Sequence, residues 1–108
     1  MLDEYKKCIE ACYLCATACD NCAASCLDEE NLEMMRECIK LDMQCANIYR
    51  LAAQFMTLNS GSAQDLCRLC ADVCQKCGDE CGKHEHDHCQ DCSSACHHCA
   101  EQCRKMAA

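Results

Sequence analysis

Cysteine and apolar side chains recur along this chain at alternating steps of three and four residues. The pattern occupies four segments, residues 8–26, 34–55, 63–81 and 89–106. Steps of three and four keep a stripe of side chains on one face of an α-helix, and such a stripe forms the buried seam of a helical bundle. No segment alternates between polar and apolar residues with a period of two, so no β-strand is predicted. The pattern therefore predicts an all-α protein.

The second segment differs from the other three because most members of its stripe are not cysteine. Its predicted seam positions are Met34, Cys38, Leu41, Cys45, Ile48, Ala52 and Phe55. The seams of the other three segments consist almost entirely of cysteine. We therefore expect the second helix to carry thiols toward its start and apolar side chains toward its end.

The stretches between the segments are short and contain signals that end and start helices. Residues 27–31 (LDEEN) are polar, and residues 59–62 (NSGS) interrupt the periodicity. Ser62 and Asp65 form a capping-box signature, which predicts that the third helix begins there.

The last connection carries two further signals. Gly82 follows the last thiol of the third segment, at a position where a left-handed residue often ends a helix, and Asp87 with Gln90 resembles a helix start. Short connections make successive helices antiparallel neighbours. The predicted fold is an antiparallel up-down-up-down four-helix bundle with a cysteine-lined core, in one domain over residues 1–108.

The composition changes the picture of what such a bundle does. Cysteine supplies 18 of the 108 residues, proline is absent and glycine occurs three times. Small chains this rich in cysteine are usually secreted disulfide scaffolds with many turn residues, whereas this chain is rich in helix formers. The first residues, MLDEYKKC, lack the pattern of a signal peptide, and no run reaches the length of a membrane span. We expect a cytoplasmic location, where cysteine clusters are more often metal ligands or redox centres than disulfides.

The chain is acidic, with a formal net charge of −8. This charge disfavours nucleic acid and anionic membrane surfaces as partners. It is typical of a solvated exterior.

Several common roles of cysteine fit this seam poorly. Thiols at this density make a weak apolar core, and each can be oxidised. Disulfides between successive turns of one helix constrain little that the helix has not already fixed. The six CxxC pairs lie inside helices and not at the N-termini where reactive dithiols are found, none is followed by histidine, and the ferredoxin run CxxCxxC is absent. Metal binding remains.

Charge then favours one kind of metal. A Zn(Cys)₄ unit carries two negative charges, and no Lys, Arg or His falls on a predicted seam position to balance them. Cu(I) is monovalent and soft, so it replaces a thiol proton one for one and leaves the core neutral. It also accepts two or three sulfurs, which CxxxC pairs on successive turns provide. The predicted Cu(I) ligands are Cys8, Cys12, Cys15, Cys19, Cys22, Cys26, Cys38, Cys45, Cys67, Cys70, Cys74, Cys77, Cys81, Cys89, Cys92, Cys96, Cys99 and Cys103.

Three stretches resemble the cytosolic copper storage proteins of bacteria. They are CIKLDMQCANIYRLAA, CGKHEHDHCQDC and CAEQCRKMAA, and the resemblance extends over the whole chain. It implies a homotetramer of four-helix bundles whose inward cysteines bind many Cu(I) ions, largely through CxxxC pairs and bridging thiolates. It also implies a storage protein and not an enzyme, with copper ions and a copper chaperone as compatible partners. Two other interpretations stay open, a zinc buffer like the metallothioneins and a peroxide-reactive thiol protein.

Antiparallel connectivity predicts two different ends of the bundle. Cys26, Met34, Cys38, Cys81 and Cys89 gather beside the sequence GKHEHDH at 82–88, and Cys8, Phe55, Cys67, Cys103 and Met106 gather at the opposite end, near Ile48 and Ala52. The first end is the predicted site of metal uptake and the second an apolar plug. The candidate uptake residues are Met34, His84, His86 and His88; the alternative is that these histidines only keep a loop hydrated.

Some residues are predicted to face outward. His97 and His98 adjoin the seam beside Cys96 and are more typical of a surface or a subunit contact than of a metal ligand. The apolar residues off the thiol seam are candidates for burial between subunits: Ile9, Leu14, Leu66, Leu69 and Val73.

Overall fold

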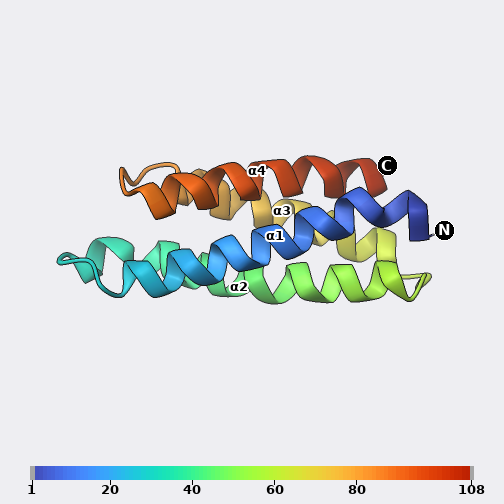
Figure 1. The fold of residues 1–108 in the computed structure, drawn as a ribbon, viewed down its shortest axis with the longest axis horizontal. Helices are drawn as coiled ribbons and strands as arrows, with labels where there is room; N and C mark the ends of the chain where they lie inside the picture. Colours follow the sequence, from blue (N-terminus) through green and yellow to red (C-terminus); the bar gives the residue numbers. More distant parts are fainter. Residues whose placement is uncertain (1, 108) are drawn as a thin grey trace.

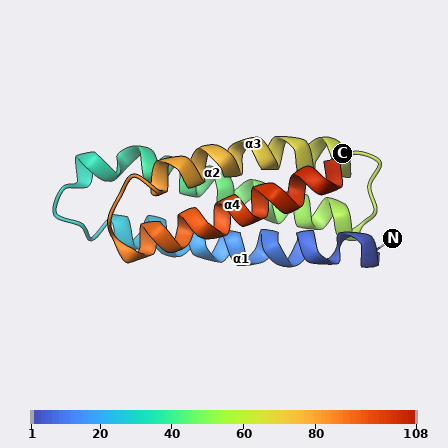
Figure 2. The same ribbon diagram turned by 90° about the horizontal axis from the view of Figure 1, so that it is seen from above.

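The computed structural model describes residues 2–107 and contains four long helices. They are α1 (Leu2–Cys26), α2 (Leu32–Thr57), α3 (Ala63–Cys81) and α4 (Asp87–Ala107). Successive helices run antiparallel and form a rod of 46 × 18 × 18 Å (Figures 1 and 2). The two chain termini and the α2–α3 connection lie at one end, and the α1–α2 and α3–α4 connections lie at the other. The prediction of an all-α, up-down-up-down bundle is confirmed.

Each helix packs against two neighbours around the axis of the bundle. α1 contacts α2 and α4, and α3 contacts the same two helices. Within residues 2–107 the backbones of the diagonal pairs, α1 with α3 and α2 with α4, do not approach closely. Side chains that point to the axis from all four helices therefore share one narrow core. None of the helices described here has an apolar stretch long enough to cross a lipid bilayer.

The core consists mainly of thiols and alanine. All 18 cysteines are at most 1% exposed, and they are packed between buried alanines such as Ala46, Ala53 and Ala100. Larger half-buried side chains cover the seams between helices: Tyr5, Ile9, Ile39, Leu41, Ile48, Phe55, Leu66, Val73 and Met106. The bundle therefore has an inner column of sulfur and an outer apolar layer.

The predicted seam of α2 is wrong at every second position. Cys38, Cys45 and Ala52 are buried as predicted, but Met34 is 61% exposed. Leu41, Ile48 and Phe55 are only half-buried, at the edges of the core. The buried residues instead are Met35, Asp42, Tyr49 and Met56. The exposed or half-buried set and the buried set both repeat every seven residues. The structure buries the second set, in which Asp42 and Tyr49 form hydrogen bonds with thiols.

Two of the predicted helix-end signals also differ from the structure. Ser62 precedes α3, but its side chain makes no capping hydrogen bond, and Asp65 pairs with Arg68 at 2.8 Å. Gly82 ends α3 in a right-handed conformation, with φ −63° and ψ −18°. Within residues 2–107 the one residue with positive φ is Asn59, at 53°, in the α2–α3 connection.

The start of α4 is stabilised in a way that the sequence did not suggest. Asp87 is the first residue of the helix, and the backbone carbonyl of His86 accepts the first amide bonds, from Cys89 and Gln90. The side-chain Nε2 of Gln90 donates to the carbonyl oxygens of Gly82 and His84, at 3.2 and 2.7 Å. This side chain therefore pairs two carbonyls of the α3–α4 connection from the first turn of α4.

Candidate metal centre

The 18 sulfur atoms lie in a column along the axis, and most of them closely approach another sulfur. The shortest contact joins Cys38 of α2 to Cys81 of α3, with their Sγ atoms 3.1 Å apart. Between α1 and α4, Cys19 lies 3.6 Å from both Cys92 and Cys96. Bonds from a thiolate to a first-row metal ion are about 2.3 Å long, so three sulfurs around one ion lie about 4 Å apart. Most of the observed separations fall near this value, and the column fits ions held by two or three thiolates.

The CxxxC pairs lie as their spacing predicts. The Sγ atoms of Cys22 and Cys26 are 3.8 Å apart, and four further pairs have separations of 3.8 or 3.9 Å: Cys70/Cys74, Cys77/Cys81, Cys92/Cys96 and Cys99/Cys103. The thiols of the two remaining pairs, 8/12 and 15/19, contact α4. The pairs therefore come from α1, α3 and α4, and contacts between helices connect them with each other and with the two thiols of α2.

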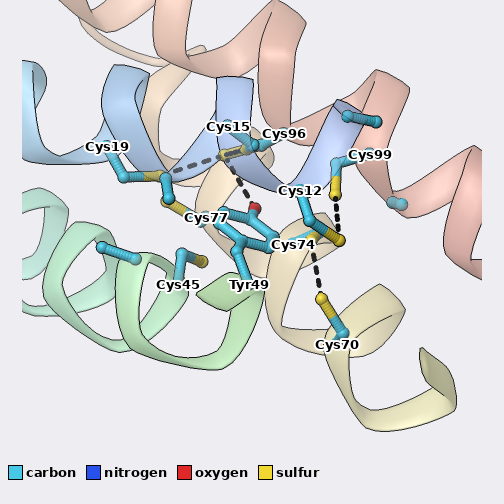
Figure 3. Close-up of a cluster of buried hydrophobic side chains, with 14 of the residues drawn as sticks. Cys12, Cys15, Cys19, Cys45, Tyr49, Cys70, Cys74, Cys77, Cys96 and Cys99 are labelled. Carbon is cyan, nitrogen blue, oxygen red and sulfur yellow. Dashed lines mark hydrogen bonds between the residues drawn. The ribbon is translucent and has the colours of Figure 1, made fainter. Parts of the chain in front are cut away.

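Several groups of four thiols could share one or more ions. Within each group all four Sγ atoms lie within 4.8 Å of one another: Cys12, Cys70, Cys99 and Cys103; Cys19, Cys45, Cys77 and Cys96; Cys22, Cys26, Cys38 and Cys89. The second group takes one thiol from each helix, and all four members are labelled in Figure 3. Such groups allow bridging thiolates, since neighbouring groups adjoin along the axis.

Asp42 is a core residue that the sequence analysis missed. Its side chain is fully buried, and its Oδ1 accepts hydrogen bonds from Cys77, Cys81 and Cys92 at 3.2, 3.4 and 3.2 Å. Cys38 donates to Oδ2 at 3.8 Å. Burial, and next the neighbouring Cys92, raise the pKa of Asp42 to about 7. The signal that would have found it is its place in the repeat Met35, Asp42, Tyr49, Met56.

Two effects shift the pKa values of the thiols in opposite directions. Burial raises the pKa of Cys15 to about 11 and that of Cys89 to about 12, because a thiolate is poorly solvated there. Cys96 accepts hydrogen bonds from Cys15 and Cys19, and these lower its pKa. The metal-free core is therefore largely protonated, with thiolate favoured where several S–H groups converge.

Of the three loop histidines, His88 is the one beside the thiols. Its Nδ1 lies 3.5 Å from the sulfur of Cys89 and 3.9 Å from that of Cys26. Its other ring nitrogen, Nε2, is buried without a hydrogen-bond partner and lies 3.8 Å from a carboxylate oxygen of Glu29. His86 stacks on His88, with ring centroids 5.4 Å apart, and its Nε2 lies 2.9 Å from Glu29.

The other candidate uptake residues are farther from the sulfur column. His84 is turned toward α3, where its Nε2 lies 2.9 Å from Glu80. Met34 lines two surface hollows that His86 also lines, one of about 290 Å³ and one of about 260 Å³. His97 lies on the surface with Asp79 at 3.0 Å, and His98 is exposed as well. The structure thus gathers Met34, His84 and His86 around one surface hollow and places His88 in contact with the thiols.

Comparison with known proteins identifies the family. The sequence model described as copper storage protein matches residues 1–108. The chain belongs to the copper storage protein family. This confirms the family resemblance found in the sequence.

Individual relatives agree over nearly the whole chain. The uncharacterized cysteine-rich protein YhjQ of Bacillus subtilis is 50% identical over 108 residues, which is 99% of this chain and 100% of that protein. Cu(I)-bound copper storage protein BsCsp3 is 50% identical, with a TM-score of 0.94 over 97% of this chain and 99% of its own. A cytosolic copper storage protein from Streptomyces lividans, with five coppers, is 35% identical, with a TM-score of 0.94 over 98% of this chain and 93% of its own.

Proposed function

We propose that this copper storage family member holds many Cu(I) ions per chain as thiolate complexes in the cytoplasm, and that it catalyses no reaction. The observation that carries the proposal is the buried column of 18 thiols at separations suited to two- and three-coordinate ions. The relatives support it, since one is Cu(I)-bound and another is a cytosolic copper storage protein. The role is storage or detoxification of copper, with a copper chaperone as a compatible donor or recipient.

Charge balance favours Cu(I) over zinc in this core. Each Cu(I) that replaces a thiol proton leaves the net charge unchanged, whereas closed Zn(Cys)₄ sites would add negative charge. Within residues 2–107 no Lys or Arg side chain is buried among the thiols, and Asp42 adds a further acidic group. Burying unpaired charge is costly, so several zinc sites in this column are disfavoured.

The stoichiometry tests the proposal. Anaerobic titration of the reduced protein with Cu(I) is expected to saturate near 18 ions per chain, one for each cysteine. Native mass spectrometry with elemental analysis measures the count, and parallel titrations with Zn(II) and Fe(II) provide the comparison. Saturation at only four or five ions would indicate isolated tetrahedral sites and contradict the copper column. Tighter binding of Zn(II) would favour the zinc buffer.

Metal uptake is proposed at the end of the bundle that carries residues 82–88, hereafter the loop end. The double variant His86→Ala/His88→Ala is expected to take up Cu(I) more slowly, by roughly tenfold or about 1.4 kcal/mol of barrier, because it removes the nitrogen donor beside Cys26 and Cys89 and the imidazole stacked on it. Capacity is expected to stay near that of the wild type, since the cysteines supply the storage ligands. Stopped-flow uptake under anaerobic conditions measures both quantities.

His84→Ala is the matched control for this experiment. It removes a histidine of the same connection, but one that pairs with Glu80 and not with a thiol. Uptake by this variant should match the wild type. If the double variant also loads at the wild-type rate, the histidines only hydrate the connection and uptake occurs through thiols alone.

A homotetramer is the proposed assembly. Leu14 and Leu69, on the outside of α1 and α3, are 70% and 53% exposed, and Ile9, Leu66 and Val73 are half-buried beside them along the same helices. These side chains supply apolar surface for contacts between copies. The native mass spectra that count copper also count chains, and a 12.1 kDa monomer at micromolar concentration would contradict this assembly.

A further inference from the structure

Tyr49 is the largest of the fully buried side chains, and it crosses the axis of the thiol core. It starts on α2, and its hydroxyl donates a hydrogen bond to the sulfur of Cys96 on α4, at 3.3 Å. These two helices are diagonal in the bundle, and their backbones do not approach closely anywhere in residues 2–107. A side chain that joins diagonal helices must pass through the middle of the core. Figure 3 shows the ring between thiols on either side of it.

The thiols fall into two sets that meet at this ring. The loop-side set extends from the loop end to Tyr49 and has eleven members: Cys15, Cys19, Cys22, Cys26, Cys38, Cys45, Cys77, Cys81, Cys89, Cys92 and Cys96. The far-side set has seven: Cys8, Cys12, Cys67, Cys70, Cys74, Cys99 and Cys103. Over residues 2–107 no thiol–thiol hydrogen bond of 4.0 Å or less joins the two sets, and Cys15 and Cys99 are the thiols that interact across the boundary beside the ring.

The lining of the core also changes at Tyr49. Toward the loop end α2 contributes Cys38, Asp42 and Cys45, all of which face neighbouring thiols. Beyond Tyr49 its buried residues are Ala52, Ala53 and Met56. The far-side set is therefore built from three helices, and α2 closes it with apolar side chains. An ion moving along α2 finds no thiolate of that helix beyond the ring.

Asp42 also crosses the axis, but it does not divide the column. Its carboxylate accepts hydrogen bonds from thiols of α2, α3 and α4. It therefore connects thiols within the loop-side set. Tyr49 differs because its ring carries no ligand atom, and its single polar atom donates to Cys96 of the loop-side set and lies beside Cys74 of the far-side set.

We propose that Tyr49 divides the store into a loop-side compartment of eleven thiols and a far-side compartment of seven, and that Cu(I) fills the second only when this side chain moves aside. The inference rests on the proposed function. Displacement of the ring requires the hydroxyl to give up its hydrogen bond to Cys96. Loading from the loop end is therefore sequential, and ions in the far-side compartment exchange more slowly than the others.

Loading kinetics test the division. Wild-type protein is expected to take up near eleven Cu(I) in a fast phase and near seven in a slow phase, at one ion per thiol. Tyr49→Ala should merge the phases by accelerating the slow one more than roughly tenfold, because it opens the axis. Tyr49→Phe keeps the ring but loses the hydrogen bond to Cys96, so a smaller acceleration, roughly two- to tenfold, is expected. Total capacity should stay near that of the wild type in both variants.

Met56→Ala is the matched control, since it removes a large buried side chain beyond the ring without clearing the axis. It should keep the slow phase. A second measurement needs no variant: anomalous diffraction from wild-type crystals given about eight equivalents of Cu(I) should place copper only among the loop-side thiols.

The outcomes separate the two proposals. A single uptake phase in the wild type, an unchanged slow phase in Tyr49→Ala, or copper on both sides of the ring at low loading would each overturn the division while leaving storage intact. A total capacity of four or five ions would instead overturn the proposed function.

Discussion

Replacing Asp42 with asparagine is expected to stabilise the metal-free protein at pH 8 and to remove most of the change in its stability between pH 4 and pH 7. The carboxyl group is fully buried, and its pKa is raised from 3.8 to about 7, first by burial and next by Cys92. Asparagine has a similar shape, keeps a carbonyl oxygen for the thiol donors and cannot ionise. The variant therefore removes a buried charge and keeps the oxygen that accepts from Cys77, Cys81 and Cys92, while its amide nitrogen can donate to the sulfur of Cys38 in place of the bond to Oδ2.

The direction of this pH dependence follows from the number of protons bound to Asp42 in the folded and unfolded chains. Between pH 4 and pH 7 the unfolded chain has lost the proton of Asp42, whereas the folded chain keeps it. Unfolding then releases a proton, so the free energy of unfolding falls as the pH rises through this window. Three pH units correspond to a loss on the order of 4 kcal/mol. Above pH 7 the carboxyl group is ionised in the folded chain too, and the folded state then bears the full free-energy cost of burying its charge.

Urea unfolding of the reduced, metal-free protein, followed by circular dichroism at pH 5 and pH 8, measures this effect. The gain of Asp42→Asn over the wild type should be larger at pH 8 than at pH 5. Asp72→Asn is the control, because it removes an exposed acidic group of α3 and changes the net charge by the same amount. Equal pH dependence in the wild type and Asp42→Asn would show that the buried carboxyl group does not govern stability.

The thiol column was predictable from spacing because cysteine occupies both alternating positions of the seam in α1, α3 and α4. No other set of residues in those helices competes for the core, and every one of these cysteines is buried. The choice of metal was predictable as well. A core without Lys or Arg cannot balance the negative charge of several Zn(Cys)₄ sites, whereas Cu(I) replaces thiol protons without changing the charge. The bundle topology followed from the short connections.

The buried face of α2 could not be predicted uniquely from the sequence. Two sets of residues, one with Leu41 and Ile48 and the other with Asp42 and Tyr49, can each complete a stripe with Cys38, Cys45 and Ala52. Hydrophobicity alone favours the stripe of Leu41 and Ile48 over that of Asp42 and Tyr49, since an acidic group is costly in an ordinary core. Here the core is lined with S–H donors, and they satisfy the carboxylate. The sequence could not show this, because it depends on thiols contributed by other helices.

The environments of His84 and His88 were also not predictable from the sequence alone. His84 lies four residues after Glu80, so a continuation of α3 pairs the two side chains. His88 lies within the first turn of α4, next to Cys89, and this position directs it to the sulfur column. A pattern of alternating histidines does not distinguish these environments unless the helix boundaries are known. Gly82 is right-handed because the chain tightens after α3, where the amides of Lys83 and His84 bond to the carbonyls of Glu80 and Cys81 and no left-handed residue is needed.

Metal-free protein is expected to be a folded helical bundle, and Cu(I) is expected to make it far more resistant to denaturation. The outer apolar layer, which includes the half-buried Ile39, Leu41 and Phe55, packs between the helices through contacts that involve no metal ligand. The side chain of Asn31 accepts a hydrogen bond from the amide of Met34 and stabilises the start of α2 without metal. Removal of copper by a Cu(I) chelator should therefore change the ellipticity at 222 nm by less than about a tenth.

The gain from copper comes from thiolate groups that join different helices, such as Cys19, Cys45, Cys77 and Cys96. A site held at a thousand times its Kd adds about 4 kcal/mol to the free energy of unfolding, and many such sites act together. The guanidinium midpoint of the loaded protein should move above about 5 M. Replacing these four cysteines with alanine should lower that midpoint more than replacing four thiols drawn from only three helices, such as Cys12, Cys70, Cys99 and Cys103. A metal-free chain that is a random coil and folds only with Cu(I) would contradict this account, since the helices would then depend on the metal as those of a zinc finger do.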